Sequence, residues 1–367
     1  MLSSLAVVVS RRGGIVTKLI RRSMSSRGGC GGCGGGCCNA GPSSSSRRPN
    51  ILADSWSAIS CEYERVLVPR FAPWTIDALD ALRDAVVVVV DGDATGGEDG
   101  EDEGEDAVVA ARSPPGAKRA LVLCCGPGQE LLPIAKILGP NSTVLGTDLA
   151  PGMIEAAGRR IEADPLEGDD GGDSASHEGR IAVEVGDATD PPPGGPYDVV
   201  FSAFGLQQLP HPMSAVATWL GSLGPGGVCV LIYWPPRPPN VSSDHPFVLW
   251  EDLVKRELGR NNDATREMEE DVAWDENIVD AIHRVGGIEI IIDEYISHDI
   301  TWKDGRDMFE GMSKAGPWHA MRLKRGDEFV DMLGEVLVSR YPPHETLAHS
   351  FAARMIVARK KGLERDG

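Results

Sequence analysis

Apolar runs and helical periods alternate along the chain from Lys118 onward. The apolar, β-prone runs lie at residues 120–125, 143–147, 181–185, 197–202 and 228–234. The segments with a helical period lie at residues 129–138, 151–163 and 213–223. Strands and helices in regular alternation are typical of a parallel sheet with helices packed on its faces, so the pattern predicts an α/β fold.

The flanking segments add further elements. Before the alternating part, residues 54–85 are predicted to be helical, and residues 86–90 form a β-prone run of valines. After it, helices are predicted at residues 247–257, 276–284, 307–313 and 328–341, and strands at residues 288–292 and 351–358. The sum is one doubly wound, Rossmann-like sheet of about seven strands, mostly parallel with an antiparallel last strand, and with helices on both faces.

Charge and composition narrow the class of protein. The 367 residues carry a formal net charge of −19, and 41% of them are hydrophobic, which is enough for a buried core. The acidic excess disfavours non-specific binding to nucleic acids or anionic membranes. No apolar run approaches the ~18 residues of a membrane span, so none is predicted. Acids and glycines gather at residues 91–106 and 164–179, which are predicted to be solvated loops.

The first 50 residues differ from the rest in charge. They contain no Asp or Glu but eight Arg or Lys, together with many serines and a partly amphipathic stretch over residues 5–20. This composition is typical of an organelle transit peptide. We expect a mitochondrial destination, with a plastid or a disordered cytosolic tail as the alternatives.

The eight cysteines divide into two groups. Half lie in a glycine-rich tract, at Cys30, Cys33, Cys37 and Cys38, and the others are Cys61, Cys124, Cys125 and Cys229. The first group contains a Cys-x-x-Cys pair, but a low-complexity segment is a better interpretation than a zinc site, because nothing around it can hold tetrahedral geometry. The second group is scattered and indicates buried thiols in a reducing compartment. We predict no metal site.

A glycine turn between the first strand and the next helix is the best candidate for a binding site. Gly126-Pro127-Gly128 lets a ligand approach the backbone, and the helix that follows aims free N–H groups at it. Asp148 follows at the end of the second strand, where an acid accepts both hydroxyls of a ribose in nucleotide-binding βαβ units. A nicotinamide site is the main competitor, but Leu131 stands where that fingerprint has its third glycine. The pattern predicts a ligand with an adenosine-like ribose.

Four motifs in this order resemble those of class I S-adenosylmethionine-dependent methyltransferases. They stand at residues 121–128, 146–153, 186–188 and 197–209, and residues 223–228 resemble the turn into the fifth strand. The resemblance is to the small-molecule branch, which includes ubiquinone- and menaquinone-biosynthesis methyltransferases, and it covers roughly residues 54–235 well. It implies S-adenosyl-L-methionine as the cofactor and a small molecule as the methyl acceptor.

Composition and the resemblance together predict four parts of the chain. Residues 1–50 are the transit or disordered segment, and residues 51–117 hold the N-terminal helices and an acidic loop. Residues 118–235 are the cofactor-binding core, and residues 236–367 supply acceptor-site insertions and the final strands of the same domain. The oligomeric state is left open.

Individual residues receive roles from the same resemblance. The cofactor-binding residues that it implies are Tyr63, Cys125, Gly126, Pro127, Gly128, Asp148, Leu149, Met153, Asp187, Ala188, Ser202 and Ala203. The glycines would admit the methionine part of the cofactor, Leu149 and Met153 would flank the adenine, and Ser202 and Ala203 would line the methionine end. Asp187 would accept from the adenine amine, with capping of a turn as its alternative. Tyr63 would close over the cofactor, with simple packing as its alternative.

Two positions depart from the family's first motif. An acid and a glycine usually stand where this chain has Val122 and Cys124. Their absence removes a hydrogen-bonding anchor near the methionine part of the cofactor and adds a Cβ beside it. The alternative function is therefore a methyltransferase-fold assembly or binding factor with little or no methylating activity.

Methyl transfer is an in-line displacement, so much of its rate comes from placing the nucleophile about 3 Å from the methyl carbon. His211 is a candidate general base if the acceptor must lose a proton, and Gln207 and Gln208 are candidates for orienting the acceptor. In the C-terminal part, Trp302, Trp318 and His319 belong either to the acceptor pocket or to the core. Residues 204–206 read Phe-Gly-Leu instead of the Asn/Asp-Pro-Pro-Tyr of amide- and adenine-methylating relatives, which argues against a DNA methylase.

Overall fold

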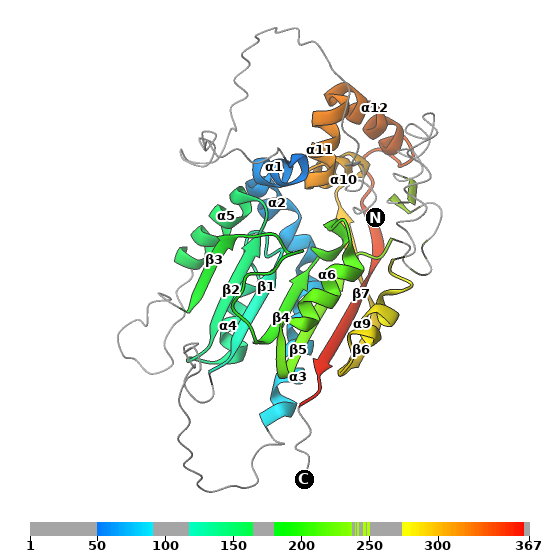
Figure 1. Cartoon of the computed structure of the whole chain (residues 1–367). Coiled ribbons are helices and arrows are strands. Elements are labelled where there is room, and N and C mark those ends of the chain that lie inside the picture. Colours follow the sequence, from blue (N-terminus) through cyan, green and yellow to red (C-terminus); the bar gives the residue numbers. More distant parts are fainter. Residues whose placement is uncertain are drawn as a thin grey trace, which may run out of the picture.

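The computed structural model describes residues 50–90, 117–163, 180–236 and 274–362, together with positions 239, 241, 245, 246, 248 and 249 (Figure 1). The predicted transit segment up to residue 49 and the predicted acidic loops at 91–106 and 164–179 lie outside the described residues. So does the helix predicted at 247–257, apart from positions 248 and 249, which are helical.

A seven-stranded sheet runs through the molecule in the order β3-β2-β1-β4-β5-β7-β6. Its strands are β1 (Arg119–Leu123), β2 (Thr143–Asp148), β3 (Ile181–Val185), β4 (Tyr197–Ala203), β5 (Leu223–Tyr233), β6 (Ile288–Trp302) and β7 (Leu347–Lys360). Strand β7 runs in the opposite direction to the other six strands, because it pairs antiparallel with both β5 and β6. This confirms the predicted mostly parallel sheet with an antiparallel last strand. The strand order reverses between β1 and β4, and ligands of open α/β sheets bind beside such a switch point, past the carboxyl ends of the strands.

Helices cover both faces of the sheet and its carboxyl end (Figure 1). They are α1 (Ile51–Ala58), α2 (Ser60–Val66), α3 (Val68–Val90), α4 (Leu131–Leu138), α5 (Pro151–Ala163), α6 (Pro212–Gly221), α9 (Ile278–Val285), α10 (Gly305–Met312), α11 (Gly316–Arg325) and α12 (Asp327–Val338). One face packs against α3, α4 and α5, and the other against α6 and α9. The helices α1, α2, α10, α11 and α12 lie above the carboxyl ends of the parallel strands, where the predicted site is.

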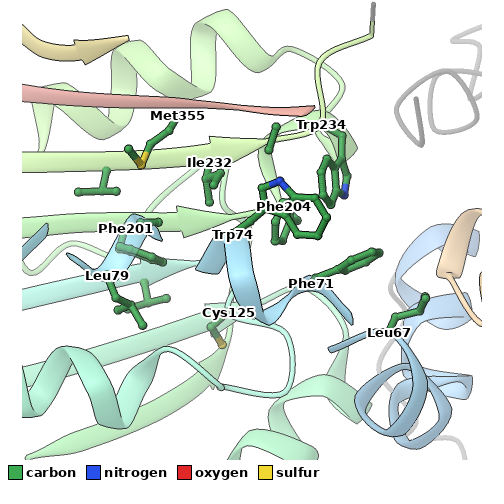
Figure 2. Packing of buried hydrophobic residues seen from close by; sticks show 14 of the residues in the cluster. Leu67, Phe71, Trp74, Leu79, Cys125, Phe201, Phe204, Ile232, Trp234 and Met355 are labelled. Carbon is green, nitrogen blue, oxygen red and sulfur yellow. The ribbon is translucent and has the colours of Figure 1, made fainter. Parts of the chain in front are cut away.

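The core is divided by the sheet into two apolar layers because every central strand is buried on both faces, as in a parallel sheet. Trp74 of α3 packs in one layer with Phe201, Ile232 and Met355 of the sheet (Figure 2). Trp219 of α6 fills the other layer and is fully buried. Its indole Nε1 donates to Ala188 O over 2.7 Å, which ties the loop after β3 to that layer.

The valine run at 86–90 is helical, and its prediction as a β-prone run is wrong. These residues form the last turns of α3, which continues without a break from Val68. Val86 is buried in the layer beneath α3, and Arg359 of β7 donates from Nη2 to Ala85 O over 2.7 Å. Packing of this helix against the sheet outweighs the β propensity of valine, which is a weak preference that depends on context.

Two strands are longer than their predicted bounds, and one helix has no counterpart among the predicted elements. The strand predicted at 228–234 begins already at Leu223, because Leu223 pairs with Tyr197 across a register shift before the strand resumes at Val228. The strand predicted at 288–292 extends to Trp302, since β7 pairs with it along its whole length. Helix α11 was not predicted; its first turn, Gly316 to Ala320, contains Gly and Pro, and its apolar face is buried.

A buried ionic network joins β5, β6, β7 and the turn before α9. Arg354 of β7 donates to both carboxylate oxygens of Asp293 over 2.8 and 2.9 Å, and to Asp275 Oδ1 over 3.0 Å. The hydroxyl of Tyr233 donates to the same oxygen of Asp275 over 2.7 Å. Arg354 is 8% exposed and Asp275 is 5% exposed, so each charge depends on its partners for compensation.

Among the described helices, none is both long enough and apolar enough to cross a membrane.

Candidate functional site

The glycine turn after β1 presents two glycines in the left-handed region, with φ of +52° at Gly126 and +76° at Gly128. Their surroundings differ. A Cβ built on Gly126 would meet nothing within 4 Å, so this peptide is open to close approach. A Cβ on Gly128 would lie 2.9 Å from Ala157 Cβ of α5, so the missing side chain there allows the helix to pack on the turn. Contact of the cofactor with Gly128, Pro127 or Cys125 stays a prediction.

Asp148 ends β2 directly beside this turn. Its Oδ2 accepts from Gly126 N over 3.0 Å, and its Oδ1 accepts from Ala150 N over 2.9 Å. Burial raises the pKa of Asp148 to about 6, and the two backbone N–H donors work against that rise. The structure thus brings the predicted ribose-binding acid and the predicted open glycine into direct contact, which sequence separation alone did not specify.

Cys124 adopts a φ of +53°, a conformation that costs a residue with a Cβ about 1–2 kcal/mol. This position is one of the two departures from the family motif, and the left-handed backbone explains why glycine is usual there. Its side chain points toward the end of β4: a Cβ built on Gly205 would lie 2.8 Å from Cys124 Sγ and 3.1 Å from Ser202 Oγ. The cysteine is therefore accommodated by a glycine opposite it and leaves the open side of Gly126 free.

Ser202 and Ala203 lie at the carboxyl end of β4 on the other side of the switch point. Ser202 is 1% exposed, and its Oγ finds no hydrogen-bond partner among the described residues. A buried hydroxyl without a partner is costly, and such atoms mark places where a ligand or water completes the bonding. This orphaned hydroxyl faces the turn that carries Cys124, in the place predicted for the methionine end.

The helices α1 and α2 cover the start of α5 next to Asp148. Gly152 N donates to Ser57 Oγ over 3.2 Å, and a Cβ on Gly152 would lie 2.5 Å from Ser57 O. Met153 is buried beneath the edge-to-face pair of Trp56 and Tyr63, whose ring centroids are 5.1 Å apart. Burial raises the pKa of Tyr63, and the charges of Glu130 and Asp148 add to this effect. Tyr63 is thus close to the predicted ribose site, while its closure over a cofactor stays a prediction.

Two predicted adenine contacts lie at the outer rim. Leu149 is 38% exposed, which suits a side chain that would cover a bound base. Asp187 follows β3 and is exposed; its Oδ1 accepts from Thr189 N over 2.9 Å and from Thr189 Oγ1 over 2.7 Å. The turn-capping alternative for Asp187 is therefore present, and the adenine contact of Asp187 and Ala188 stays a prediction.

The three candidates for acceptor chemistry, Gln207, Gln208 and His211, differ in burial and in hydrogen bonding. Gln207 is 1% exposed and donates from Nε2 to Phe204 O over 2.6 Å, so it holds the turn after β4. The amide of Gln208 is buried, and neither its oxygen nor its nitrogen has a partner within the described part of the chain. His211 is exposed at the start of α6 and makes no capping hydrogen bond. Gln207 Oε1 is also buried without a partner among the described residues, so Gln208 differs from Gln207 in that both of its amide atoms lack one.

An aromatic cluster lies past the ends of β4 and β5, and no sequence pattern predicts it. It consists of Phe71, Trp74, Phe204, Trp234 and Phe351 (Figure 2 shows the first four). Phe204 stacks on Trp234 with centroids 4.4 Å apart and 16° between the planes, and Trp234 meets Phe351 edge-on at 4.6 Å. Because these residues come from α3, from β7 and from the segments that follow β4 and β5, only the tertiary fold assembles them.

Two histidines adjoin the aromatic cluster. The rings of His245 and His349 lie 4.9 Å apart, and His245 also lies 5.4 Å from Phe351. Burial and then the neighbouring His245 lower the pKa of His349 to about 4. Both imidazoles are therefore neutral near neutral pH.

Trp302 and Trp318 are 1% and 2% exposed, so both belong to the core beneath α10 and α11. The guanidinium carbon of Arg70 lies 4.2 Å from the centroid of the Trp302 ring. His319 is partly exposed, and burial followed by the charge of Arg322 lowers its pKa. The core interpretation of the two tryptophans is the one that their burial supports.

Glu130 is a buried acid beside the turn that the sequence did not single out, since a polar residue after a glycine turn is typical of any helix start. It precedes α4 but makes no side-chain capping bond there, and it is 2% exposed. Burial raises the pKa of Glu130 to about 8, opposed by a backbone N–H, Arg160 and Gln129. A buried acid beside the turn is the strongest polar feature of the site after Asp148.

No group of three or more His, Cys, Asp or Glu among the described residues is arranged to hold a metal ion. A groove of about 400 Å³ lies between α3 and α4, lined by residues that include Ile76 and Lys136. None of the predicted site residues lines this groove, so it is separate from the candidate site.

The residues at the switch point fit an S-adenosyl ligand. An open glycine peptide, a half-buried carboxylate at the end of β2 and an orphaned hydroxyl at the end of β4 lie at the carboxyl ends of neighbouring strands of the sheet. These are, in order, a place for close backbone approach, an acceptor for ribose hydroxyls and a donor for the amino-acid end of the ligand.

The central part of the chain is similar to known methyltransferases. Residues 120–227 match the family described as a methyltransferase domain. Trans-aconitate 2-methyltransferase of Methylobacterium nodulans is 34% identical over 132 residues, which are 35% of this chain and 43% of that protein. Demethylmenaquinone methyltransferase of Geobacillus kaustophilus is 28% identical over 116 residues, which are 31% and 44% of the two chains.

The match spans less than half the length of each of these two relatives. Among solved structures, YjhP from E. coli is similar over 85% of this chain and 100% of its own, with 15% identity and a TM-score of 0.41.

Proposed function

We propose that this chain, which contains a methyltransferase domain at residues 120–227, is an S-adenosylmethionine-dependent methyltransferase that acts on a small-molecule acceptor. S-adenosylmethionine is the cofactor that such a domain implies. The observation that carries the proposal is the hydrogen bond from Gly126 N to the half-buried carboxylate of Asp148 at the switch point of the sheet. It joins the open glycine of the first motif to the acid of the second, which is predicted to bind the ribose.

The chain's own residues would position the ligand. Asp148 would accept the ribose hydroxyls, and the open backbone at Gly126 would lie against the amino-acid part. Bound S-adenosylmethionine supplies an electrophilic methyl group with a neutral leaving group. The protein therefore contributes chiefly by holding the acceptor in line and by keeping water out.

The acceptor site would lie between the end of β4 and the covering helices. Ser202 and Gln208 carry buried polar atoms there without partners among the described residues, and the aromatic cluster begins at Phe204. Apolar ring faces with a few polar atoms are typical of sites for small organic ligands. An acceptor that must lose a proton would find a neutral imidazole at His245 or His349 in the same region.

Calorimetry of the full chain with S-adenosylmethionine and S-adenosylhomocysteine tests the proposal. We expect micromolar binding of both, and loss of binding in Asp148→Ala. A matched control is Asp190→Ala, which changes an exposed acid in the loop after β3. Absence of binding to the wild-type chain would overturn the enzyme proposal and favour the assembly-factor alternative, for which the departures at Val122 and Cys124 are the supporting observation.

A mitochondrial location, with a plastid as the alternative, is the remaining part of the proposal. It rests on the acid-free, Arg- and Ser-rich composition of residues 1–50. Fusion of these residues to a fluorescent protein should direct it to mitochondria, whereas diffuse fluorescence would contradict the transit role.

A further inference from the structure

Glu130 lies beside the glycine turn, and only one of its two carboxylate oxygens has a hydrogen-bond partner among the described residues. Its Oε1 accepts from Gln129 Nε2 over 2.7 Å, and its Oε2 is buried without a hydrogen-bond partner among the described residues. The carboxylate does not cap α4, although it stands at the N-cap position. Since a buried carboxyl group with an unused oxygen is destabilising, a purely structural role gives no reason for it.

The cation whose charge acts on Glu130, Arg160, makes its hydrogen bonds to other residues. Arg160 of α5 donates from Nη2 to Glu64 over 2.6 Å and from Nε to Pro127 O over 3.1 Å, so its guanidinium is bound elsewhere. Arg160 lowers the pKa of Glu130 less than burial raises it, and the result is about 8. Glu130 is therefore protonated at neutral pH until a better-placed cation arrives.

The position of Glu130 points to the amino-acid end of the ligand. Glu130 stands at the N-cap of α4, two residues after Gly128, and Asp148 accepts from Gly126 N in the same turn. The charges of both acids raise the pKa values of Tyr63 and Cys125, which agrees with this placement. Asp148 serves the ribose end. Val122, where the family usually has its acid, is 1% exposed in the apolar core and offers no charge.

We propose that Glu130 binds the α-ammonium group of the methionine part of the cofactor and so replaces the acid missing at Val122. This rests on the proposed function. The ammonium is the one group at that end of the ligand that needs a carboxylate, and a charge-assisted bond in a buried site is strong. Binding then transfers the proton of Glu130 to solvent, because the bound cation favours the ionised carboxylate.

The test compares two ligands that differ only at the ammonium. S-adenosylhomocysteine carries it, and the deamino analogue of S-adenosylhomocysteine keeps the carboxylate and thioether but lacks it. In the full chain, Glu130→Gln should weaken S-adenosylhomocysteine about 10- to 100-fold and change the deamino analogue less than about twofold. Asp148→Asn, as the matched control, should weaken both ligands equally because both carry the ribose.

Proton release gives a second readout that needs no variant. Calorimetry at pH 7 in buffers of different ionisation enthalpy should show about one proton released per S-adenosylhomocysteine bound, and markedly less for the deamino analogue. Equal losses for the two ligands in Glu130→Gln, or no difference in proton release, would overturn the role of Glu130 and leave the proposed function standing. Failure of the wild-type chain to bind either ligand would overturn both.

Discussion

Cys124 occupies the space that a side chain at Gly205 would need. A Cβ on Gly205 would lie 2.8 Å from Cys124 Sγ, and Cys124 itself has a φ of +53°. The two residues are 81 positions apart and meet only because β1 and β4 are neighbours in the sheet. The side chain of Cys124 therefore fits because position 205, at the end of β4, carries none.

Gly205→Ala should destabilise the protein by about 2–3 kcal/mol, because the added methyl group overpacks the contact with Cys124. Cys124→Gly should relieve both the clash and the left-handed strain, so the double variant should recover most of the loss. Urea unfolding of the four proteins completes the cycle. Additive effects of the two substitutions would show that the residues are not coupled.

The free energy of unfolding without cofactor should fall as pH rises from 6 to 8, in part through Glu130. Burial raises the pKa of Glu130 from 4.5 to about 8, so the unfolded chain releases this proton earlier than the folded one. Stability from this group is full below pH 4.5 and is lost as pH rises toward 8, by about 1.4 kcal/mol per pH unit.

Glu130→Gln should remove this slope, and urea unfolding at pH 6, 7 and 8 measures it. The two proteins share all other titrating groups, so only the difference between their slopes counts. Parallel curves for the wild type and the variant would contradict a buried, protonated Glu130.

Arg354→Met should destabilise the protein by about 3–5 kcal/mol, since it leaves Asp275 and Asp293 without their buried cation. The matched control is Arg83→Met on α3, whose pair with Asp80 is more than half exposed on both sides. That change should cost less than about 0.5 kcal/mol. Equal losses in the two variants, measured by chemical unfolding, would show that the Arg354 network contributes no more than a surface pair.

Alanine at Gly128 should lower stability, whereas alanine at Gly126 should chiefly weaken ligand binding. Gly128→Ala places a Cβ 2.9 Å from Ala157 Cβ, so it should lower the melting temperature, and Ala157→Gly should restore part of it. Gly126→Ala meets no neighbour and should cost only the ~1–2 kcal/mol of its left-handed φ. Its larger effect should be on S-adenosylhomocysteine binding, which calorimetry measures. Unchanged affinity in Gly126→Ala would argue against approach of the ligand to this peptide.

The sequence by itself determined the elements that local patterns dictate. The alternation of apolar runs and helical periods predicted the parallel sheet, and helix α5 (Pro151–Ala163) and strand β3 (Ile181–Val185) have the predicted bounds. The glycine turn and Asp148 were found because their chemistry depends on residue type at fixed spacing in one βαβ unit. Such features are local, so one sequence contains them.

The tertiary structure decided what depends on distant neighbours. Valines 86–90 are helical because α3 packs on the sheet, and the 2% exposure of Glu130 beside the turn is a property of the folded chain that its residue type does not predict. Gly205 leaves room for the side chain of Cys124. Gly128 allows α5 to pack on the turn, whereas Gly126 leaves its peptide open. Burial and contact across the sheet are properties of the folded chain, and they set the pKa values and the packing on which the site depends.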